Sequence, residues 1–99
     1  MYFILDADGR TPIPCQYWEW VHFFENENRL LAEDRIGPYL ISTYFVGMNE
    51  RILPGRPPLI FESTLFINDT SFCEAKYSTY EQAMAGHKSA CEVAMSKVN

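Results

Sequence analysis

The fold is decided by residues 59–98, LIFESTLFINDTSFCEAKYSTYEQAMAGHKSACEVAMSKV, which predict two paired strands followed by a long helix. The run 59–67 is rich in β-branched and aromatic residues, as strands commonly are. The turn-forming residues NDTS at 68–71 follow, and 73–77 is expected to return as the antiparallel partner. The next four residues, Ser78 to Glu81, fit a capping box, so the helix is predicted to begin there.

The predicted C-terminal helix is amphipathic. Apolar side chains recur at helical spacing as far as Val98, and charged or polar side chains fall on the opposite side. Gly86 and Ala90 lie beside the apolar face, where such small residues let a helix approach a sheet closely. The predicted inward face consists of Tyr80, Ala83, Met84, His87, Cys91, Ala94, Met95 and Val98.

The first half of the chain predicts three further strands and a shorter helix. Residues 30–36 and 39–46 are expected to pair around Pro38, because proline cannot donate to a sheet ladder and belongs in the turn. With a strand at 2–5 and a helix at 15–28, the order becomes β-α-β-β-β-β-α. This order predicts an α+β fold, a two-layer sandwich in which both helices pack on one face of a mainly antiparallel sheet.

Length, composition and charge limit the classes of function. The 99 residues predict a single domain, residues 1–99, with a formal net charge of -5. A hydrophobic fraction of 47% excludes a disordered chain, and no apolar run approaches the roughly 20 residues that a membrane span needs. The 8 basic residues are dispersed, which disfavours nucleic acid as a partner because phosphate binding depends on clustered Lys and Arg.

The cysteines and the N-terminus predict a reducing compartment. Cys15, Cys73 and Cys91 are odd in number and widely spaced, which is typical of free thiols and not of a disulfide framework. The first residues show neither the basic leader nor the apolar segment of a secretory signal, so we expect an intracellular protein.

The first predicted helix carries more large aromatic residues than one sheet face can easily cover. Trp20 and Phe24 fall on one face at helical spacing, while Trp18 and Phe23 flank that face on opposite sides. Surplus aromatic residues predict a surface for self-association or for another protein, and a homodimer is the expected oligomer. The alternative is that the proline-rich segment 12–14 covers them.

Three charged residues are candidates for holding a small ligand. Arg51 and Arg56 lie in the proline-rich loop 47–58, where two guanidinium groups can bind a phosphate or a carboxylate in bidentate fashion. Glu62 interrupts an apolar strand and can anchor a ligand from the sheet face. The alternatives are a solvated loop and a carboxylate that simply reaches solvent from an uncovered sheet face.

His87 and Cys91 lie four residues apart on the predicted inward face, a spacing that can present two ligands to a metal ion. Cys15, Cys73 or Glu62 would have to complete such a site. On a core-facing stripe, however, we expect such residues to pack or to form internal hydrogen bonds. The sequence therefore predicts no metal, no cofactor and no catalytic residue.

Four blocks of sequence, taken in order, resemble a family of small tailed-phage and prophage proteins. They are YFILD (2–6) with PIPC (12–15), STYFVG (42–47), PPLIFES (57–63), and YSTYEQA (77–83) with AGH (85–87). The family reads YFILD…PxPC, STVFLG, PPLLFETMVF and RYSTWEEAEAGH in the same order. The resemblance implies a phage or prophage origin and expression in the cytoplasm of a bacterial host. Where the family continues STVFLG with LDH, this chain has MNE at 48–50, so a function of that acid and imidazole is not expected here.

Together these features predict a non-enzymatic protein of phage origin that binds another protein, from the host or from the phage. Inhibition of a host defence component and an accessory role for the phage are two forms of this function. One alternative is a protein that binds a small ligand or a nucleotide signal through the loop arginines and Tyr44 or Tyr77. The other alternative is a metal-dependent enzyme centred on His87 and Cys91.

Overall fold

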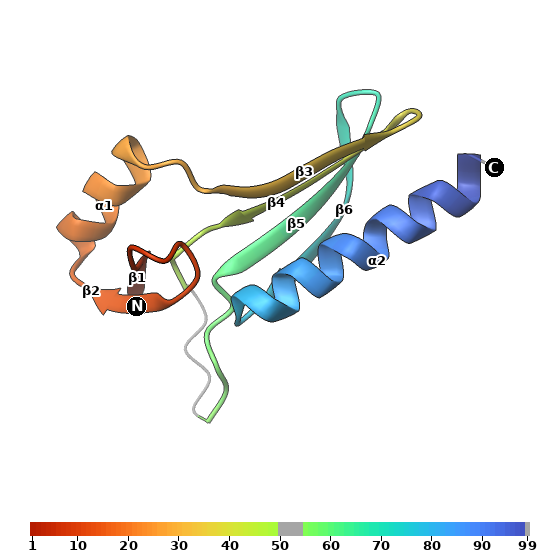
Figure 1. The fold of residues 1–99 in the computed structure, drawn as a ribbon. Helices are drawn as coiled ribbons and strands as arrows, with labels where there is room; N and C mark the ends of the chain where they lie inside the picture. The colour runs from red at the N-terminus through yellow and green to blue at the C-terminus, as the bar shows by residue number, and fades with distance from the viewer. Residues whose placement is uncertain (50–54, 99) are drawn as a thin grey trace.

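The computed structural model describes residues 1–49 and 55–98, apart from the side chain of Cys73 (Figure 1). Its elements are β1 (Tyr2–Leu5), β2 (Pro12–Cys15), α1 (Tyr17–Asn26), β3 (Leu30–Ile36), β4 (Tyr39–Phe45), β5 (Phe61–Ile67), β6 (Thr70–Tyr77) and α2 (Tyr80–Val98). β1 and β2 form a hairpin, and the remaining strands form one sheet with the order β3-β4-β5-β6.

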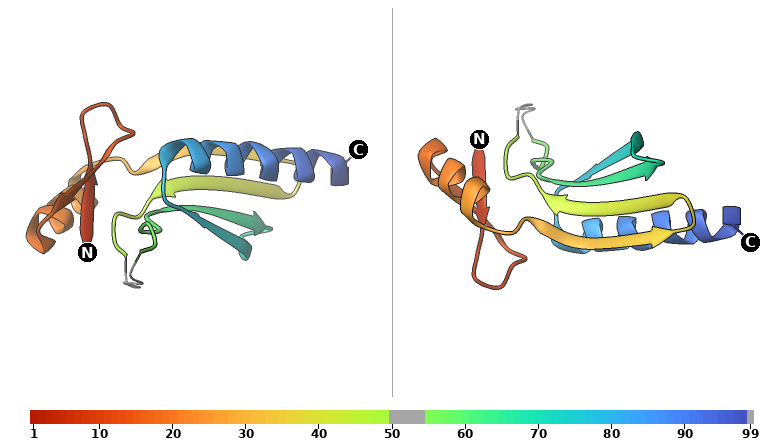
Figure 2. Two further views of the ribbon diagram at one scale, coloured as in Figure 1. Left: turned by 90° about the horizontal axis from the view of Figure 1, so that it is seen from below. Right: turned by 90° about the horizontal axis from the view of Figure 1, so that it is seen from above.

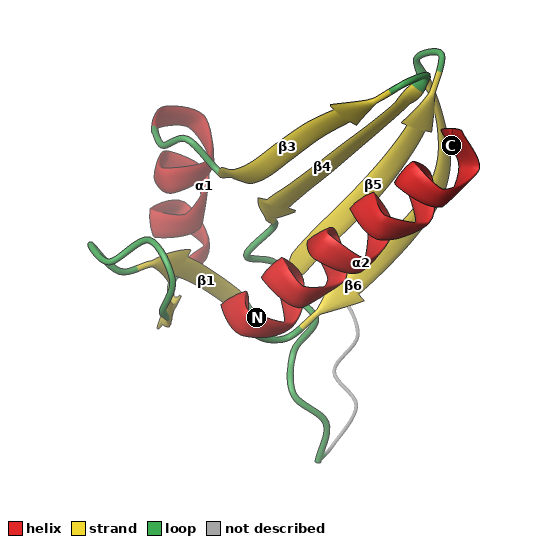
Figure 3. Ribbon diagram, turned by 45° about the vertical axis from the view of Figure 1, so that its right-hand side comes forward, coloured by secondary structure: helices red, strands yellow, loops and turns green. Residues whose placement is uncertain are grey.

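The four-stranded sheet and α2 form the two layers of the fold. Each strand of this sheet pairs antiparallel with its neighbour in sequence. α2 lies across one face and contacts all four strands, while the opposite face carries no helix of the described chain (Figure 2, Figure 3). The predicted α+β class and mainly antiparallel sheet are confirmed. Neither described helix is long and apolar enough to cross a membrane.

Tight turns join the strands of the sheet. Gly37 has a positive φ of 58° between β3 and β4, as a turn beside Pro38 requires. Asn68 and Asp69 have φ values of 50° and 68°, the left-handed conformation of a two-residue hairpin turn that these residue types tolerate. Because the turn needs only two residues, β6 begins at Thr70, three residues before the predicted start of this strand.

The cap of α2 is shifted by one residue from the prediction. The Gln82 amide donates to Thr79 Oγ1 at 3.1 Å, and the Gln82 side-chain oxygen accepts from the amides of Ser78 and Thr79. The capping box is therefore formed by Thr79 and Gln82, not by Ser78 and Glu81. Both pairs fit the same sequence pattern, so the pattern alone does not distinguish them.

The inward face of α2 is confirmed over most of its length. Ala83, His87 and Ala94 are buried. Met95 and Val98 are about half exposed, with 52% and 45% of their surface accessible. The C-terminal end of α2 runs past the turn between β3 and β4, so the sheet does not cover this end (Figure 2).

The N-terminal segment departs from the prediction in that residues 12–15 form a strand. Leu5 pairs with Pro12 and Phe3 with Pro14, which closes a hairpin. The turn is held by the Asp8 carboxylate, which accepts hydrogen bonds from the Arg10 and Thr11 amides. Prolines two residues apart direct their missing N–H groups to the same edge, and an edge strand tolerates that loss.

The prediction that both helices pack on one face of the sheet is wrong for α1. This helix packs on the hairpin and not on the sheet face covered by α2 (Figure 1). Its contacts are with β1, and it reaches the sheet only near the end of β4. The hairpin supplies the apolar surface that the periodicity of α1 requires. The two helices therefore belong to separate packing units that meet at one end of the sheet.

The junction between these units is the short segment after β4. Gly47 accepts a hydrogen bond from the Phe3 amide at 2.7 Å, and Val46 accepts one from the indole Nε1 of Trp20 at 3.0 Å. The amides of Val46 and Gly47 both donate to the carbonyl of Ile60. This segment thus joins β1, α1 and the start of β5.

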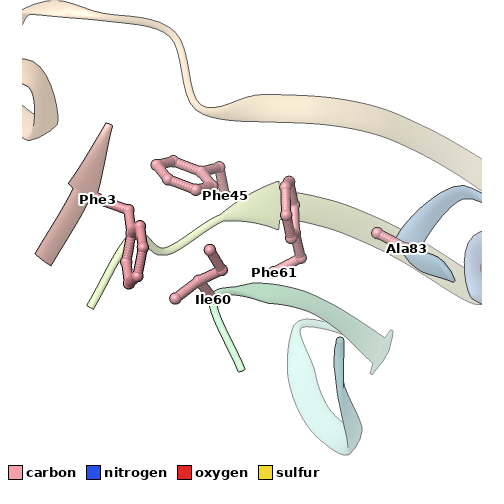
Figure 4. Packing of buried hydrophobic residues seen from close by; sticks show 5 residues of the cluster. All are labelled: Phe3, Phe45, Ile60, Phe61 and Ala83. Carbon is pink, nitrogen blue, oxygen red and sulfur yellow. The ribbon is translucent and has the colours of Figure 1, made fainter. Parts of the chain in front are cut away.

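The apolar core continues through this junction. Phe45 and Phe61 are completely buried and contact each other edge to face, with ring centroids 5.2 Å apart. Phe3 from β1 and Ala83 from α2 pack on the same cluster, which also includes Ile60 (Figure 4). The hairpin unit and the helix–sheet unit therefore share one core.

Gly47 is expected to tolerate no side chain. Its φ is +73°, and a Cβ would lie 2.5 Å from the Phe3 carbonyl oxygen and 2.9 Å from Trp20 Nε1. Gly47→Ala should lower the free energy of unfolding by about 1–2 kcal/mol for the left-handed backbone and by roughly 1–3 kcal/mol more for the steric conflict. Urea unfolding measures the sum. The control is Gly9→Ala, which has a φ of +71° and no atom within 4 Å, and should show the backbone cost alone. Equal losses for the two variants would contradict the tight junction.

Candidate functional site

α1 is held by backbone and side-chain hydrogen bonds at both ends. The Gln16 amide donates to the Glu19 carboxylate at 3.0 Å, which anchors the first turn. At the other end the Glu27 amide donates to the Phe23 carbonyl, and the Asn26 side chain donates to the His22 carbonyl. The helix is therefore shorter at both ends than the predicted span of 15–28.

Aromatic rings form a continuous row along one side of α1. Tyr2 from β1 lies 5.2 Å from Tyr17 and 5.4 Å from Trp20, measured between ring centroids. Trp20 in turn lies 5.0 Å from Phe24. The Arg29 guanidinium stacks 3.6 Å from the centroid of Phe24 and also donates to the Phe45 carbonyl. These contacts fix the orientation of the rings, so the row is ordered without a partner.

Three aromatic side chains of α1 remain exposed to solvent. Trp18 is 70% exposed, Tyr17 58% and Phe24 40%, and no residue of α1 is buried. We call these three side chains the α1 aromatic surface. The proline-rich strand β2 does not cover Trp18, so the alternative considered from the sequence fails at this position.

Phe23 does not belong to the α1 aromatic surface. Its ring packs edge to face on Phe45 with centroids 5.8 Å apart, and it lies against the core cluster. The sequence grouped Phe23 with Trp18 because both flank the same helical face. The structure separates them, since the flank that carries Phe23 points toward the end of the sheet.

The proposed small-ligand residues are not brought together in the described part of the chain. Arg51 lies outside the described residues, and Arg56 is exposed. Tyr77 lies under α2 against Gly86, where any side chain at position 86 would collide with its ring and hydroxyl. Tyr44 lies on the opposite face of the sheet, because it pairs with Glu62, the neighbour of the buried Phe61.

Glu62 lies on the sheet face without a helix, as its alternation predicted. The Tyr44 hydroxyl donates to its carboxylate at 2.8 Å, and Lys76 stands opposite it in the ladder. Burial raises the pKa of Tyr44, so its hydroxyl keeps the proton that it donates. A carboxylate at this place disfavours a phosphate ligand. Glu62 and Lys76 also line a shallow hollow of about 480 Å³.

A chain of polar side chains runs between the sheet and α2. Ser63 Oγ and Thr43 Oγ1 are 2.6 Å apart, and Thr43 Oγ1 is 2.7 Å from His87 Nδ1. On the other side of the ring, His87 Nε2 is 2.7 Å from Asp34 Oδ2. We call these four residues the polar chain. With a neutral imidazole, every hydrogen can point from Ser63 toward Asp34, so all buried groups are satisfied.

The order carboxylate, imidazole, hydroxyl resembles that of a nucleophilic triad, but the hydroxyl cannot reach a substrate. Thr43 is completely buried and His87 is 5% exposed. The buried side chains form hydrogen bonds with one another, and these bonds fix the distance between α2 and the central strands. Only the Asp34 end opens to solvent, where this side chain is 57% exposed.

At this end Cys91 joins the cluster. Its Sγ is 3.7 Å from Asp34 Oδ2, and the three donor atoms of Asp34, His87 and Cys91 all lie within 4.8 Å of one another. Burial raises the pKa of the Cys91 thiol, and the Asp34 carboxylate adds to the rise. The helical spacing of His87 and Cys91 predicts this pair, whereas Asp34 is not expected from it. The signal for Asp34 is strand alternation, which places Ala32, Asp34 and Ile36 on the same side of β3, the side covered by α2.

Of the other partners considered for this pair, two lie elsewhere, and the side chain of Cys73 lies outside the described residues. Glu62 is on the far face of the sheet, and Cys15 belongs to the β1–β2 hairpin, where it is a free thiol. Burial also raises the pKa of Cys15.

Comparison with known proteins gives no match: no family model, no curated protein and no solved structure is detectably similar to this chain.

Two substitutions at Thr43 separate the contribution of its hydroxyl group to stability from the contribution of its methyl group. Thr43→Val keeps the shape but leaves His87 Nδ1 and Ser63 Oγ without their shared partner, which should cost about 1–3 kcal/mol of stability. Thr43→Ser keeps the hydroxyl and removes one methyl group, which should cost about 1 kcal/mol. Chemical unfolding of both variants measures the difference. A Val variant as stable as the wild type would contradict the hydrogen-bond assignment.

The two flanking aromatics of α1 should behave differently in unfolding experiments. Trp18→Ala removes a side chain that is mostly in solvent, so the free energy of unfolding should change by about 0.5 kcal/mol or less. Phe23→Ala removes the contact with Phe45 and should cost roughly 2–3 kcal/mol. Equal losses of unfolding free energy in the two variants would contradict the difference in burial between Trp18 and Phe23.

Proposed function

We propose that the protein is a non-enzymatic binding protein that docks on another protein through the α1 aromatic surface. The observation that carries this proposal is the composition and exposure of α1. Five of its ten residues are aromatic, yet none of the ten is buried. Tyr17 and Phe24 are already ordered by their ring contacts and therefore lose little entropy on binding. Large exposed aromatic side chains such as Trp18 dominate the energy of protein interfaces.

The charge of α1 favours a partner other than a second copy of this chain. The helix carries Glu19 and Glu25 and has no lysine or arginine. Two copies packed through this helix would bring four carboxylates together, and each chain would add one cation, Arg29, which stacks on Phe24. A partner with an apolar centre and a rim of Lys or Arg is complementary, and the net charge of -5 supports attraction over a longer range. The homodimer expected from the sequence is thus the less favoured form of this proposal.

The origin of the partner rests on the phage resemblance of the sequence. It supports a site of action in the cytoplasm of a bacterial host, with a host protein, such as a defence component, or a phage protein as the partner. The alternative of a protein that binds a nucleotide signal receives less support, because the Tyr44 hydroxyl donates a hydrogen bond to the Glu62 carboxylate.

The experiment compares three tagged proteins in a lysate of phage-infected bacteria: the wild type, Trp18→Ala and Phe72→Ala. Phe72 is the matched control, since it is 73% exposed but lies on β6. We expect the wild type and Phe72→Ala to retain the same protein, with retention weakened by salt. Trp18→Ala should lose it, with an affinity loss of about 2 kcal/mol or more for the purified pair.

Two outcomes contradict the proposal. One is retention of the same protein by Trp18→Ala. The other is a wild-type chain that forms dimers in light scattering at micromolar concentration and becomes monomeric on Trp18→Ala, since that would assign the surface to self-association.

A further inference from the structure

We propose that Asp34, His87 and Cys91 form a binding site for a divalent cation of the zinc class, between α2 and the edge strand β3. The site uses one oxygen, one nitrogen and one sulfur donor from the protein. A water molecule can supply a fourth ligand, because the Asp34 side chain is 57% exposed to solvent. It is separate from the α1 aromatic surface and goes beyond the proposed function.

The donor set and its placement suit zinc. A mixture of imidazole, thiolate and carboxylate selects a borderline-soft cation over Mg²⁺ or Ca²⁺, which prefer oxygen ligands alone. His87 and Cys91 are four positions apart on α2, so both side chains project from the same side of the helix. Asp34 approaches from β3, and its Oδ2 lies 2.7 Å from His87 Nε2 and 3.7 Å from Cys91 Sγ.

Binding of a cation requires a movement of the Asp34 side chain. Donors arranged tetrahedrally at zinc-ligand bond lengths lie about 3.5 Å apart. The separation of 3.7 Å between Cys91 Sγ and Asp34 Oδ2 already fits, whereas the 2.7 Å between His87 Nε2 and Asp34 Oδ2 must open. Asp34 can make this movement, because its side chain is 57% exposed and lies on an edge strand.

The inner nitrogen of His87 is held as metal-binding histidines require. Such residues usually donate their second ring N–H to a fixed acceptor, which sets the ring orientation and raises its basicity as a ligand. His87 Nδ1 is 2.7 Å from Thr43 Oγ1, and Thr43 is in turn 2.6 Å from Ser63 Oγ. The ring is therefore directed so that Nε2 points toward Asp34 and Cys91.

The polar chain can serve both the free and the occupied site. Without metal, a ring hydrogen on Nε2 lets Thr43 donate to Nδ1 and Nε2 donate to Asp34. With metal, Nε2 must present its lone pair, so the ring hydrogen lies on Nδ1 and Thr43 accepts it. Thr43 then donates to Ser63. Hydroxyl groups allow this reversal because each is both donor and acceptor. The imidazole keeps one proton throughout, and the thiol of Cys91 releases one to solvent on coordination.

The test is titration of the whole purified protein with Co²⁺ and with Zn²⁺ under reducing conditions. Co²⁺ bound to a thiolate gives a charge-transfer band in the near ultraviolet, and tetrahedral coordination gives strong visible bands. We expect one equivalent of Co²⁺ to produce both signals and Zn²⁺ to displace it. Zn²⁺ should also raise the thermal unfolding temperature, since it binds only the folded arrangement of α2 and β3.

Variants distinguish this site from other thiols and carboxylates. Cys91→Ala should abolish the thiolate band, and Asp34→Asn should weaken binding by roughly tenfold or more. Both positions are at least partly exposed, so the fold should persist. Cys15→Ala removes the other described free thiol, and Glu33→Gln removes a neighbouring carboxylate that faces Ser42 on the opposite side of β3. These two controls should bind as the wild type does. Absence of stoichiometric binding, or a thiolate band that survives in Cys91→Ala, overturns the proposal.

Discussion

The fold depends on the backbone segment of Val46 and Gly47, in which Gly47 has no room for a side chain. Their amides converge on the Ile60 carbonyl, and their carbonyls accept from the Phe3 amide and the Trp20 indole. Because β1, α1 and β5 all attach here, the position of α1 relative to the sheet is set by this junction. One side of α1 is used for attachment through Trp20 and Phe23, so the side with Trp18 is left in solvent. Exposure of the aromatic residues is thus a consequence of the architecture.

The layer between α2 and the sheet shows a second constraint. A core of this size buries hydroxyl groups and an imidazole only if each has a partner, and the polar chain supplies one to every member. This arrangement removes Thr43 from any role as a nucleophile, yet it directs the outer nitrogen of His87 toward a carboxylate and a thiol. The same contacts therefore support the packing of α2 and the proposed cation site, whereas they disfavour hydrolytic chemistry.

Features that depend on local sequence patterns could be predicted from the sequence. The strand alternation around Glu62 and the helical stripe through His87 were confirmed. The strand at 12–15 was missed because two prolines argue against a ladder, although an edge strand can accept them. Phe23 was assigned to a surface because periodicity defines a helix face but not what covers it. Asp34 was missed for a related reason: it lies 53 positions before His87 in the sequence, and only the folded sheet brings the two together.

The central claim is that α1 is where a partner binds, and hydrogen–deuterium exchange on the isolated complex tests it most directly. The account predicts slower amide exchange in the partner-bound protein across residues 17–26 and the adjoining β1–β2 hairpin. Exchange in β6 and on the sheet face without a helix should remain as in the free protein. Slower exchange confined to the sheet, with α1 unchanged, would contradict the account.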